Sequence, residues 1–225
     1  DALSHTSKWF LYNDSNDTVD NTIGTFVSGP ATAPLGLGSV KFVLGANPLN
    51  RKDVATFAYQ GTALKSIKTL SFASYSTSGV AGATESPYLV FNVDFNGSGT
   101  WQSRLVYVPS QNGAAPQDTW NTNDAIKGGA ALWNYSGATW PLTTTGPDAN
   151  LTGVAGTTLR SWSAILADYP NARILPAGGL LGVRVGEPGP TNYTGYVDDV
   201  AVGIQTGSNI NITTYDFEPD TVPPT

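Results

Sequence analysis

Residues 87–95 read PYLVFNVDF, and the alternation in this stretch decides the fold class. Leu, Phe, Val and Phe occupy the odd positions 89–95, whereas Tyr, Val, Asn and Asp occupy the even positions 88–94. A period of two places alternate side chains on opposite faces of a strand, so one face is expected to be buried. The stretch WQSRLVYVP at 101–109 has the same character, and DFNGSGTW joins the two. Residues 87–108 therefore predict a β-hairpin.

Other short runs rich in β-branched and aromatic residues predict further strands, because Gly, Pro or Asn bounds each of them. They are GSVKFVLG at 38–45, TLSFASY at 69–75 and NITTYDFE at 211–218. Many short strands with frequent turns predict an all-β protein, a β-sandwich of jelly-roll type.

One segment, TTLRSWSAILADYPNA at 157–172, has a helical period instead. Its apolar residues recur at spacings of three and four, at Leu159, Trp162, Leu166 and Tyr169. A Thr at 157 or 158 can cap the start, and Pro170 ends the pattern. We expect one short α-helix at about 157–169, packed on the sandwich.

The chain of 225 residues is expected to form a single domain over 9–217. Residues 1–8 lack a hydrophobic pattern and predict an N-terminal tail. The end, EPDTVPPT at 218–225, is Pro-rich and predicts a linker to further parts of a longer protein.

The charge pattern excludes several partners. The net charge is −6, and the 11 Lys and Arg residues are scattered, so nucleic acid is not expected to bind. No apolar run approaches the length of a membrane span, so no membrane insertion is expected. The chain lacks cysteine and therefore has neither disulfides nor a thiol nucleophile.

Only 12% of the residues are charged, and Thr, Asn, Gly and Ser supply the polarity. This composition is typical of extracellular β-proteins, so we expect an extracellular or cell-surface location. The chain also contains seven Asn-x-Ser/Thr sequons. A chain rich in Asn and Thr forms sequons by chance, but a glycosylated surface protein would show them too. The sequons lie at Asn13, Asn16, Asn96, Asn134, Asn150, Asn192 and Asn211.

Two adjacent carboxylates, Asp198 and Asp199, lie in the apolar run YTGYVDDVAVGI at 193–204. In a regular strand they point to opposite faces, so they cannot flank one glycosidic bond as a catalytic pair. Asp198 shares its face with Val200 and Val202, and a buried carboxylate there must be paired, hydrogen-bonded or bound to a metal. Backbone N–H groups at a strand bend, a calcium ion and a catalytic role all remain open.

The phrase YVDDVAVG and the following strand YDFEP resemble the closing strands of jelly-roll carbohydrate-binding modules of bacterial secreted proteins. The hairpin NVDFNGSGTWQSRLVYVP and the segment LADYPNARI are similar to a kind of uncharacterised domain in large bacterial exoproteins. The resemblance covers the second half of the chain. It implies a structural calcium ion ligated by Asp198 or Asp199. The early acidic motif that completes such a site is missing.

Two further polar loops contain oxygen ligands that calcium prefers. NDSNDTVDN at 13–21 contains Asp14, Asp17 and Asp20, and we interpret it as a solvated loop rather than a metal site. DFNGSGT at 94–100 resembles the start of a calcium loop, but a turn around Asn96 and Gly97 explains the same residues without metal.

The catalytic repertoire is small. His5 is the only histidine and lies in the predicted tail, and there is no Gly-x-Ser-x-Gly motif. The glutamates, Glu85, Glu187 and Glu218, lie next to proline or one residue from it, in predicted turns or at the end of a strand. We therefore expect no enzymatic activity.

Aromatic residues in the turn-rich middle of the chain are the candidates for ligand binding. Sugar rings stack on Trp and Tyr, and amide side chains bind hydroxyl groups. The alternative is that these rings belong to the core. The candidate set comprises Trp120, Trp133, Tyr135 and Trp140 with Asn121 and Asn123, accompanied by Asp124 and Asn134.

The sequence thus predicts a non-catalytic carbohydrate-binding module of a secreted or cell-surface multidomain protein, with a polysaccharide or other glycan as the partner. The alternative is a structural or adhesive subunit of a surface layer or filament that self-assembles through its sheet edges.

Overall fold

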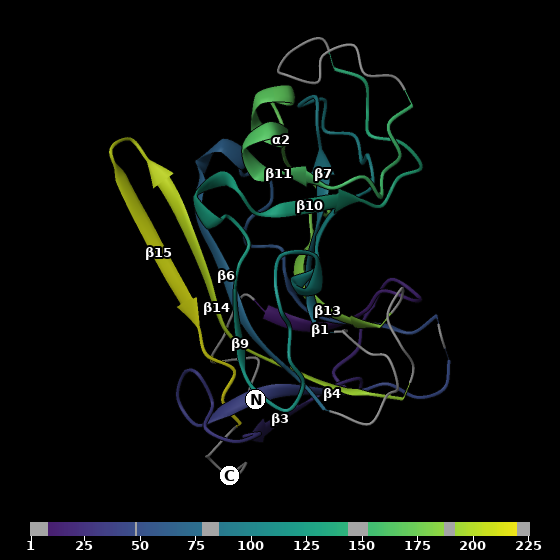
Figure 1. The fold of residues 1–225 in the computed structure, drawn as a ribbon, viewed down its shortest axis with the longest axis vertical. Coiled ribbons are helices and arrows are strands. Elements are labelled where there is room, and N and C mark those ends of the chain that lie inside the picture. Colours follow the sequence, from purple (N-terminus) through teal and green to yellow (C-terminus); the bar gives the residue numbers. More distant parts are fainter. Residues whose placement is uncertain (1–8, 48, 78–85, 144–152, 187–191, 220–225) are drawn as a thin grey trace.

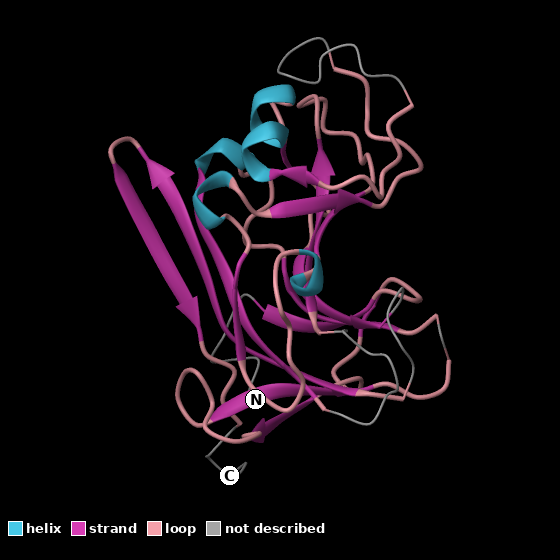
Figure 2. Ribbon diagram, in the orientation of Figure 1, coloured by secondary structure: helices cyan, strands magenta, loops and turns pink. Residues whose placement is uncertain are grey.

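The computed structural model describes residues 9–47, 49–77, 86–143, 153–186 and 192–219. Strands dominate the structure (Figure 2). They form two antiparallel sheets, and the described ranges contain a single α-helix. This arrangement confirms the prediction of an all-β sandwich with one helix. No helix in these ranges has the length and the apolar character needed to cross a bilayer.

The first sheet contains nine strands and carries the candidate site. From one edge to the other, its order is β11 (Arg160–Ser161), β10 (Leu132–Tyr135), β8 (Arg104–Tyr107), β7 (Tyr88–Asp94), β13 (Leu181–Gly186), β5 (Arg51–Thr56), β1 (Trp9–Asn13) and β2 (Thr18–Val19). The short strand β12 (Arg173–Ile174) pairs with the far part of β7.

The second sheet contains six strands. Its order is β3 (Thr25–Ser28), β4 (Gly38–Val43), β14 (Thr194–Thr206), β6 (Ile67–Ser76) and β9 (Asn121–Asp124). The strand β15 (Asn209–Tyr215) pairs with the second half of β14. Together β14 and β15 form a long hairpin that projects beside the body of the protein (Figure 1). The remaining short helices are of the 3₁₀ type, η1 (Leu64–Ser66), η2 (Pro109–Gln111) and η3 (Lys127–Gly129).

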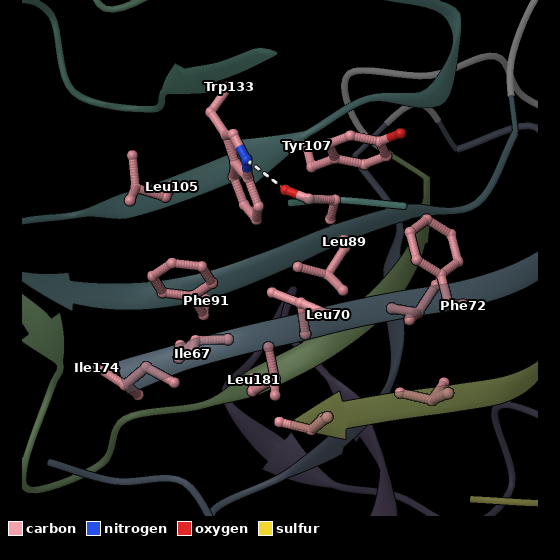
Figure 3. Packing of buried hydrophobic residues seen from close by; sticks show 14 of the residues in the cluster. Ile67, Leu70, Phe72, Leu89, Phe91, Leu105, Tyr107, Trp133, Ile174 and Leu181 are labelled. Carbon is pink, nitrogen blue, oxygen red and sulfur yellow. Dashed lines mark hydrogen bonds between the residues drawn. The ribbon is translucent and has the colours of Figure 1, made fainter. Parts of the chain in front are cut away.

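The predicted hairpin is present, because β7 and β8 pair with Leu89 opposite Tyr107 and Phe91 opposite Leu105. These four side chains lie on the inner face of the sheet and are buried. Figure 3 shows them together with Trp133, which packs beside Phe91. The even residues of β7 therefore face the other side of the sheet, as the alternation predicts.

The helix is shorter than predicted. Residues 160–161 pair with β10 as strand β11, and α2 extends only over Trp162–Asp168. Ser161 caps the helix by accepting a hydrogen bond from the backbone N–H of Ala164. Leu159 lies outside the helix and is exposed, contrary to expectation, whereas Ile165 of the helix is buried in the core. Strand pairing at Arg160 therefore overrides the helical period at this end.

Glu218, the first residue of the predicted linker, contacts the folded part of the chain. Its carboxylate accepts hydrogen bonds from the backbone N–H groups of Leu37 and Gly38. The reason is that the loop before β4 leaves two N–H groups that this carboxylate satisfies. The predicted tail at 1–8, which contains His5, and residues 220–225 lie outside the described residues.

Candidate functional site

A groove of about 620 Å³ lies on the outer face of the nine-stranded sheet. Its lining includes the even residues Tyr88 and Val90 of β7 and Arg104 and Val106 of β8, which alternate with core residues. The volume falls within the range of about 300–1,000 Å³ that is usual for ligand sites. We call this site the groove.

The lining of the groove spans several strands. Its residues come from five neighbouring strands, β10, β8, β7, β13 and β5. Because neighbouring strands lie about 4.8 Å apart, the backbones of the outermost two lie roughly 19 Å apart. Val106 supplies apolar surface in the middle, and its cross-strand partner Val90 is buried at the base.

Trp101 is the exposed aromatic residue of this site. It lies in the connection between β7 and β8, lines the groove, and 55% of its surface is accessible. Ser103 and Ser136 fix the neighbouring backbone, because their hydroxyl groups are 2.6 Å apart and Ser136 Oγ also accepts the N–H of Arg104. An exposed indole beside ordered strands is the kind of surface on which a sugar ring stacks.

Amide side chains add hydrogen-bonding groups at the β10 end. Asn134 Nδ2 donates to Gln111 Oε1 at 3.0 Å, and both residues line the groove. Gln111 belongs to η2, which directly follows β8. An amide pair of this kind offers both donors and acceptors to hydroxyl groups of a ligand.

Three arginines line the groove, and their guanidinium groups converge on Asp14. Asp14 Oδ2 lies 3.1 Å from Arg51 Nε and 3.1 Å from Arg184 Nη2, and Asp14 Oδ1 accepts from Arg104 Nη2 at 2.8 Å. The carboxylate is buried, whereas the Arg51 and Arg104 side chains keep 31% and 21% of their surface exposed. Asp14 thus holds the arginines in place from behind the ligand-facing surface.

A second carboxylate, Asp53, fixes Arg184. Arg184 donates from Nε and Nη2 to the two Asp53 oxygens, both at 2.7 Å, which is a bidentate pair. Burial raises the pKa of Asp53, and the neighbouring Arg184 opposes this shift. Burial also raises the pKa of Tyr88, so its hydroxyl stays protonated at neutral pH. Paired charges therefore fix the side chains on this side of the groove.

The structure places three of the predicted ligand residues in the core. Trp133 is completely buried, and its Nε1 donates to the carbonyl of Ala125 at 3.0 Å (Figure 3). Trp140 is buried and donates to the carbonyl of Thr158 at 3.0 Å. Tyr135 is also buried, with its hydroxyl donating to the carbonyl of Gln102, although it borders the groove. Neither Trp133 nor Trp140 therefore presents a ring face to a ligand. Both belong to the core, which is the alternative that the sequence left open.

Trp120 lies on the other sheet. It is half-buried, its Nε1 donates to the carbonyl of Pro30 at 2.8 Å, and its ring packs edge-on against Tyr75 of β6. Tyr75 in turn packs edge-on against Tyr196 of β14. These three rings form a row across the outer face of the six-stranded sheet, and none of them lines the groove.

The two predicted amides of β9 are engaged in local structure. Asn121 Nδ2 donates to the carbonyls of Pro116 and Thr119. Asn123 is buried, and its Nδ2 donates to Ser74 Oγ at 2.9 Å. The structure therefore does not bring the six predicted ligand residues together at one surface.

Asp198 is buried at a strand irregularity. Its Oδ2 accepts the N–H of Leu35 at 3.0 Å, and its Oδ1 accepts the N–H of Phe217 at 3.3 Å. The register shifts between Asp198 and Ala201, and Asp199 has a positive φ of 48°. Asp198 therefore accepts backbone N–H groups at a strand bend. This is the first of the three alternatives that the sequence left open, beside calcium binding and a catalytic role. Burial raises the pKa of Asp198 to about 6.

Asp199 is half-exposed, and burial raises its pKa. Asp216 lies nearby, and burial followed by the negative charge of Glu218 raises its pKa. Within the described ranges, no group of three or more His, Cys, Asp or Glu side chains is arranged to hold a metal ion.

The two other polar loops, residues 94–100 and 13–21, differ in how well they match the expectation from the sequence. Asp94 accepts the N–H groups of Gly97, Ser98 and Gly99 and pairs with Arg173, which is the expected turn. The interpretation of residues 13–21 as a solvated loop is wrong for Asp14, which is buried among the arginines of the groove.

Sequence reasoning missed the residues that define the groove, Trp101, Arg51, Arg104, Arg184 and Asp14. One signal was available, since Arg104 occupies an outward position between core residues of an alternating strand. Trp101 directly follows a polar turn, which is an exposed place for an indole ring. The pairing of Asp14 with arginines up to 170 positions away leaves no sequence signal.

Comparison with known proteins adds no relative: no family model matches the chain, and neither does any curated protein or solved structure.

Proposed function

We propose that this protein is a non-catalytic carbohydrate-binding module of a secreted or cell-surface multidomain protein, and that its ligand lies in the groove. The observation that carries the proposal is the exposed Trp101 ring in a groove that is also lined by hydrogen-bonding side chains. The ring offers a stacking face, and Asn134, Gln111 and Arg104 offer partners for hydroxyl groups.

The lining supports binding rather than hydrolysis. Glycoside hydrolysis usually needs two carboxylates on either side of the bond that is cleaved. Among the described residues that line the groove there is no Asp or Glu. The nearest carboxylates that we describe, Asp14 and Asp53, are held by arginines, and neither lines the groove.

The strand order supports the jelly-roll form of the sandwich. The strands β4, β14, β6 and β9 of one sheet face β5, β13, β7 and β8 of the other. Along the chain, every connection among these eight strands except β7–β8 passes from one sheet to the other. Such alternation is what two Greek keys in a double-sheet jelly roll produce.

The proposal includes a structural calcium ion near the closing strands. Asp198 is occupied by backbone N–H groups, so Asp199 and Asp216 are the carboxylates left to hold it. Asp216 Oδ1 is buried and has no hydrogen-bond partner among the described residues, and Glu218 lies against the same carboxylate. A cation would relieve this repulsion, and oxygen donors suit calcium. Its role there is to stabilise the fold.

Melting in calcium and in chelator tests the ion separately from the glycan. We expect a higher melting temperature in calcium, because an ion bound only to the folded chain stabilises it. Asp216→Asn should remove most of this difference. Equal melting temperatures, with no calcium found by elemental analysis of the untreated protein, would contradict the calcium proposal and leave the glycan proposal standing.

A glycan-array screen followed by titration tests the glycan proposal. We expect the chain to bind at least one polysaccharide, and Trp101→Ala to weaken binding about ten-fold or more, because a stacked ring contributes on the order of 1 kcal/mol or more. Ile212→Ala is the matched control, since Ile212 is 58% exposed but lies on β15. Absence of binding to every glycan, or equal losses in both variants, would contradict the proposal.

A specific observation favours the second candidate, a structural or adhesive subunit that assembles through sheet edges. Residues 209–214 of β15 are all exposed, and among the described residues β15 pairs with β14 alone. The strand carries no charge and no proline, which are common protections of an edge. Sedimentation velocity over a range of concentrations tests it: assembly that Ile212→Lys abolishes would support this candidate, and a monomer at every concentration would exclude it.

A further inference from the structure

The lining of the groove is positively charged, although the protein as a whole carries a net charge of −6. We propose that the groove selects anionic polysaccharides, and that Arg104 and Arg51 hold a carboxylate or sulfate group of the sugar that stacks near Trp101. This inference rests on the proposed function and names the class of its ligand.

Among the described residues, the charges of this cluster do not cancel. Arg51, Arg104 and Arg184 contribute three positive charges, and the described carboxylates that contact them, Asp14 and Asp53, contribute two negative charges, which leaves one positive charge within this set. These are three of the five arginines in the chain. A positive site in a concave, partly dry surface attracts anions more strongly than a flat surface would.

The two signs of charge also differ in position. The three arginines line the groove, where Arg51 and Arg104 are partly exposed and Arg184 is buried, whereas Asp14 and Asp53 are buried and do not line it. A ligand in the groove therefore meets guanidinium groups, with the carboxylates behind them. Because the ion pairs already fix the guanidinium groups, binding costs little side-chain entropy.

Arg104 retains a donor for a ligand. Its Nε donates to Asn92 Oδ1 at 3.1 Å, and its Nη2 donates to Asp14 Oδ1 at 2.8 Å. Its Nη1 has no hydrogen bond or ion pair with any described residue, and the side chain is 21% exposed. A planar guanidinium group of this kind binds carboxylate and sulfate oxygens with charge-assisted hydrogen bonds.

Trp101 lies close to Arg104 in the chain, so stacking and charge recognition can act on the same sugar unit. Trp101 is three residues before Arg104, and both line the groove. A sugar ring that stacks on the indole can therefore direct a carboxylate or a sulfate ester toward the arginine. A neutral sugar would leave the guanidinium donors to water and gain only the stacking and the amide contacts.

The test compares polymers that differ in charge alone. Polygalacturonate and its fully methyl-esterified form share the same sugar chain, and dextran sulfate and dextran provide the same contrast for sulfate. We expect one or both anionic polymers to bind about ten-fold or more tightly than the neutral counterpart, because a hydrogen bond to a charged group is worth more than a neutral one. Affinity should fall as salt is added.

Variants show whether the groove causes this preference. Arg104→Gln and Arg51→Gln should each lower the affinity for the anionic polymer several-fold and leave the weak affinity for the neutral polymer in place. Arg173→Gln is the matched control, since Arg173 is as exposed as Arg51 and pairs with a buried carboxylate, Asp94, away from the groove. If Arg104→Gln fails to fold, Arg51→Gln and the comparison of charged and neutral polymers with the wild-type protein still test the proposal.

The outcomes separate this inference from the function beneath it. Equal affinity for charged and neutral polymers, with loss of both in Trp101→Ala, would overturn the anionic selectivity and retain glycan binding. A preference for anions that Arg173→Gln reduces as much as Arg51→Gln would also overturn it, because general attraction would then explain the binding. Failure of every polymer and every array glycan to bind would overturn the proposed function itself.

Discussion

The groove and the β14–β15 hairpin use polar and apolar side chains in opposite ways. Three arginines line the groove, and two buried carboxylates behind it, Asp14 and Asp53, pair with them. The hairpin strand β15 has no charged residue and exposes Ile210 and Ile212. Charge is scarce in this chain, at 12% of the residues, so its concentration at one site needs a reason.

The difference shows that the groove, with its buried charges, is energetically more costly to form than the hairpin. Burying charges costs desolvation energy, and a buried ion pair is weak support for stability as such. Apolar residues on an exposed edge strand cost little stability but invite association. We infer that the groove is organised for recognition, whereas the exposed edge of the hairpin is suited to contact with another chain.

The largest effect on stability is expected for Trp133, which lies in the core beneath the groove. Trp133→Ala should lower the free energy of unfolding by about 3–5 kcal/mol, because it leaves a cavity in a close-packed core. The same change at the exposed Trp101 should alter stability by less than about 0.5 kcal/mol. Denaturant unfolding followed by circular dichroism measures both. Equal losses would mean that Trp101 is a core residue and that the groove lacks its stacking ring.

A smaller loss is expected when the charge behind the groove is removed. Asp53→Asn keeps the shape of the side chain but leaves Arg184 without its bidentate partner, which should cost about 1.5–3 kcal/mol. The same denaturant measurement applies, with Asp17→Asn as a control on an exposed loop. A variant as stable as the wild type would show that the ion pairs do not order the groove. It would contradict the claim that they hold the guanidinium groups in place before a ligand binds.

The local pattern of the sequence was sufficient for much of the fold. Alternation over residues 87–108 predicted both the β7–β8 hairpin and the side that it buries, because each strand has one apolar face. The helix boundary was wrong because pairing of Arg160 with β10 is a tertiary interaction that a helical period cannot report.

The site was harder to predict than the fold. Indole rings in a turn-rich segment make Trp133 and Trp140 ligand candidates by sequence, yet both rings pack inward. The role of Asp14 depends on arginines from three other strands, and nothing in the loop around it encodes those contacts. Long-range pairing of polar residues is thus the part that the sequence did not reveal.

A pH effect separates the closing strands from the groove. The pKa of Asp198 is raised to about 6 in the folded protein. The folded chain therefore binds a proton that the unfolded chain releases between about pH 4 and pH 6, and the free energy of unfolding should fall as the pH rises through this window. The raised pKa values of Asp199 and Asp216 act in the same direction.

Chemical denaturation at several pH values in the presence of chelator measures this effect. Asp198→Asn should flatten the slope between about pH 4 and pH 6, because the titrating group is then absent. A slope of the opposite sign in the wild type, or an unchanged slope in the variant, would show that another group dominates.

The smallest effect is expected at the hairpin. Ile212→Lys places a charge on the exposed edge, where it should change stability by less than about 1 kcal/mol, the whole range of strand propensities. It should leave the affinity for the selected glycan unchanged, because Ile212 does not line the groove. Calorimetric titration of this variant beside Trp101→Ala checks both statements. Loss of glycan affinity in Ile212→Lys would place the ligand on the hairpin.

The most direct test of the central claim is amide chemical-shift mapping while the chain is titrated with the glycan that it binds best. The account predicts that the largest shifts fall within residues 101–108 of the β7–β8 hairpin and within residues 134–137, the two segments that supply most of the lining of the groove. Shifts centred instead on Tyr75, Trp120 and Tyr196, or on β15, with the groove unchanged, would contradict it.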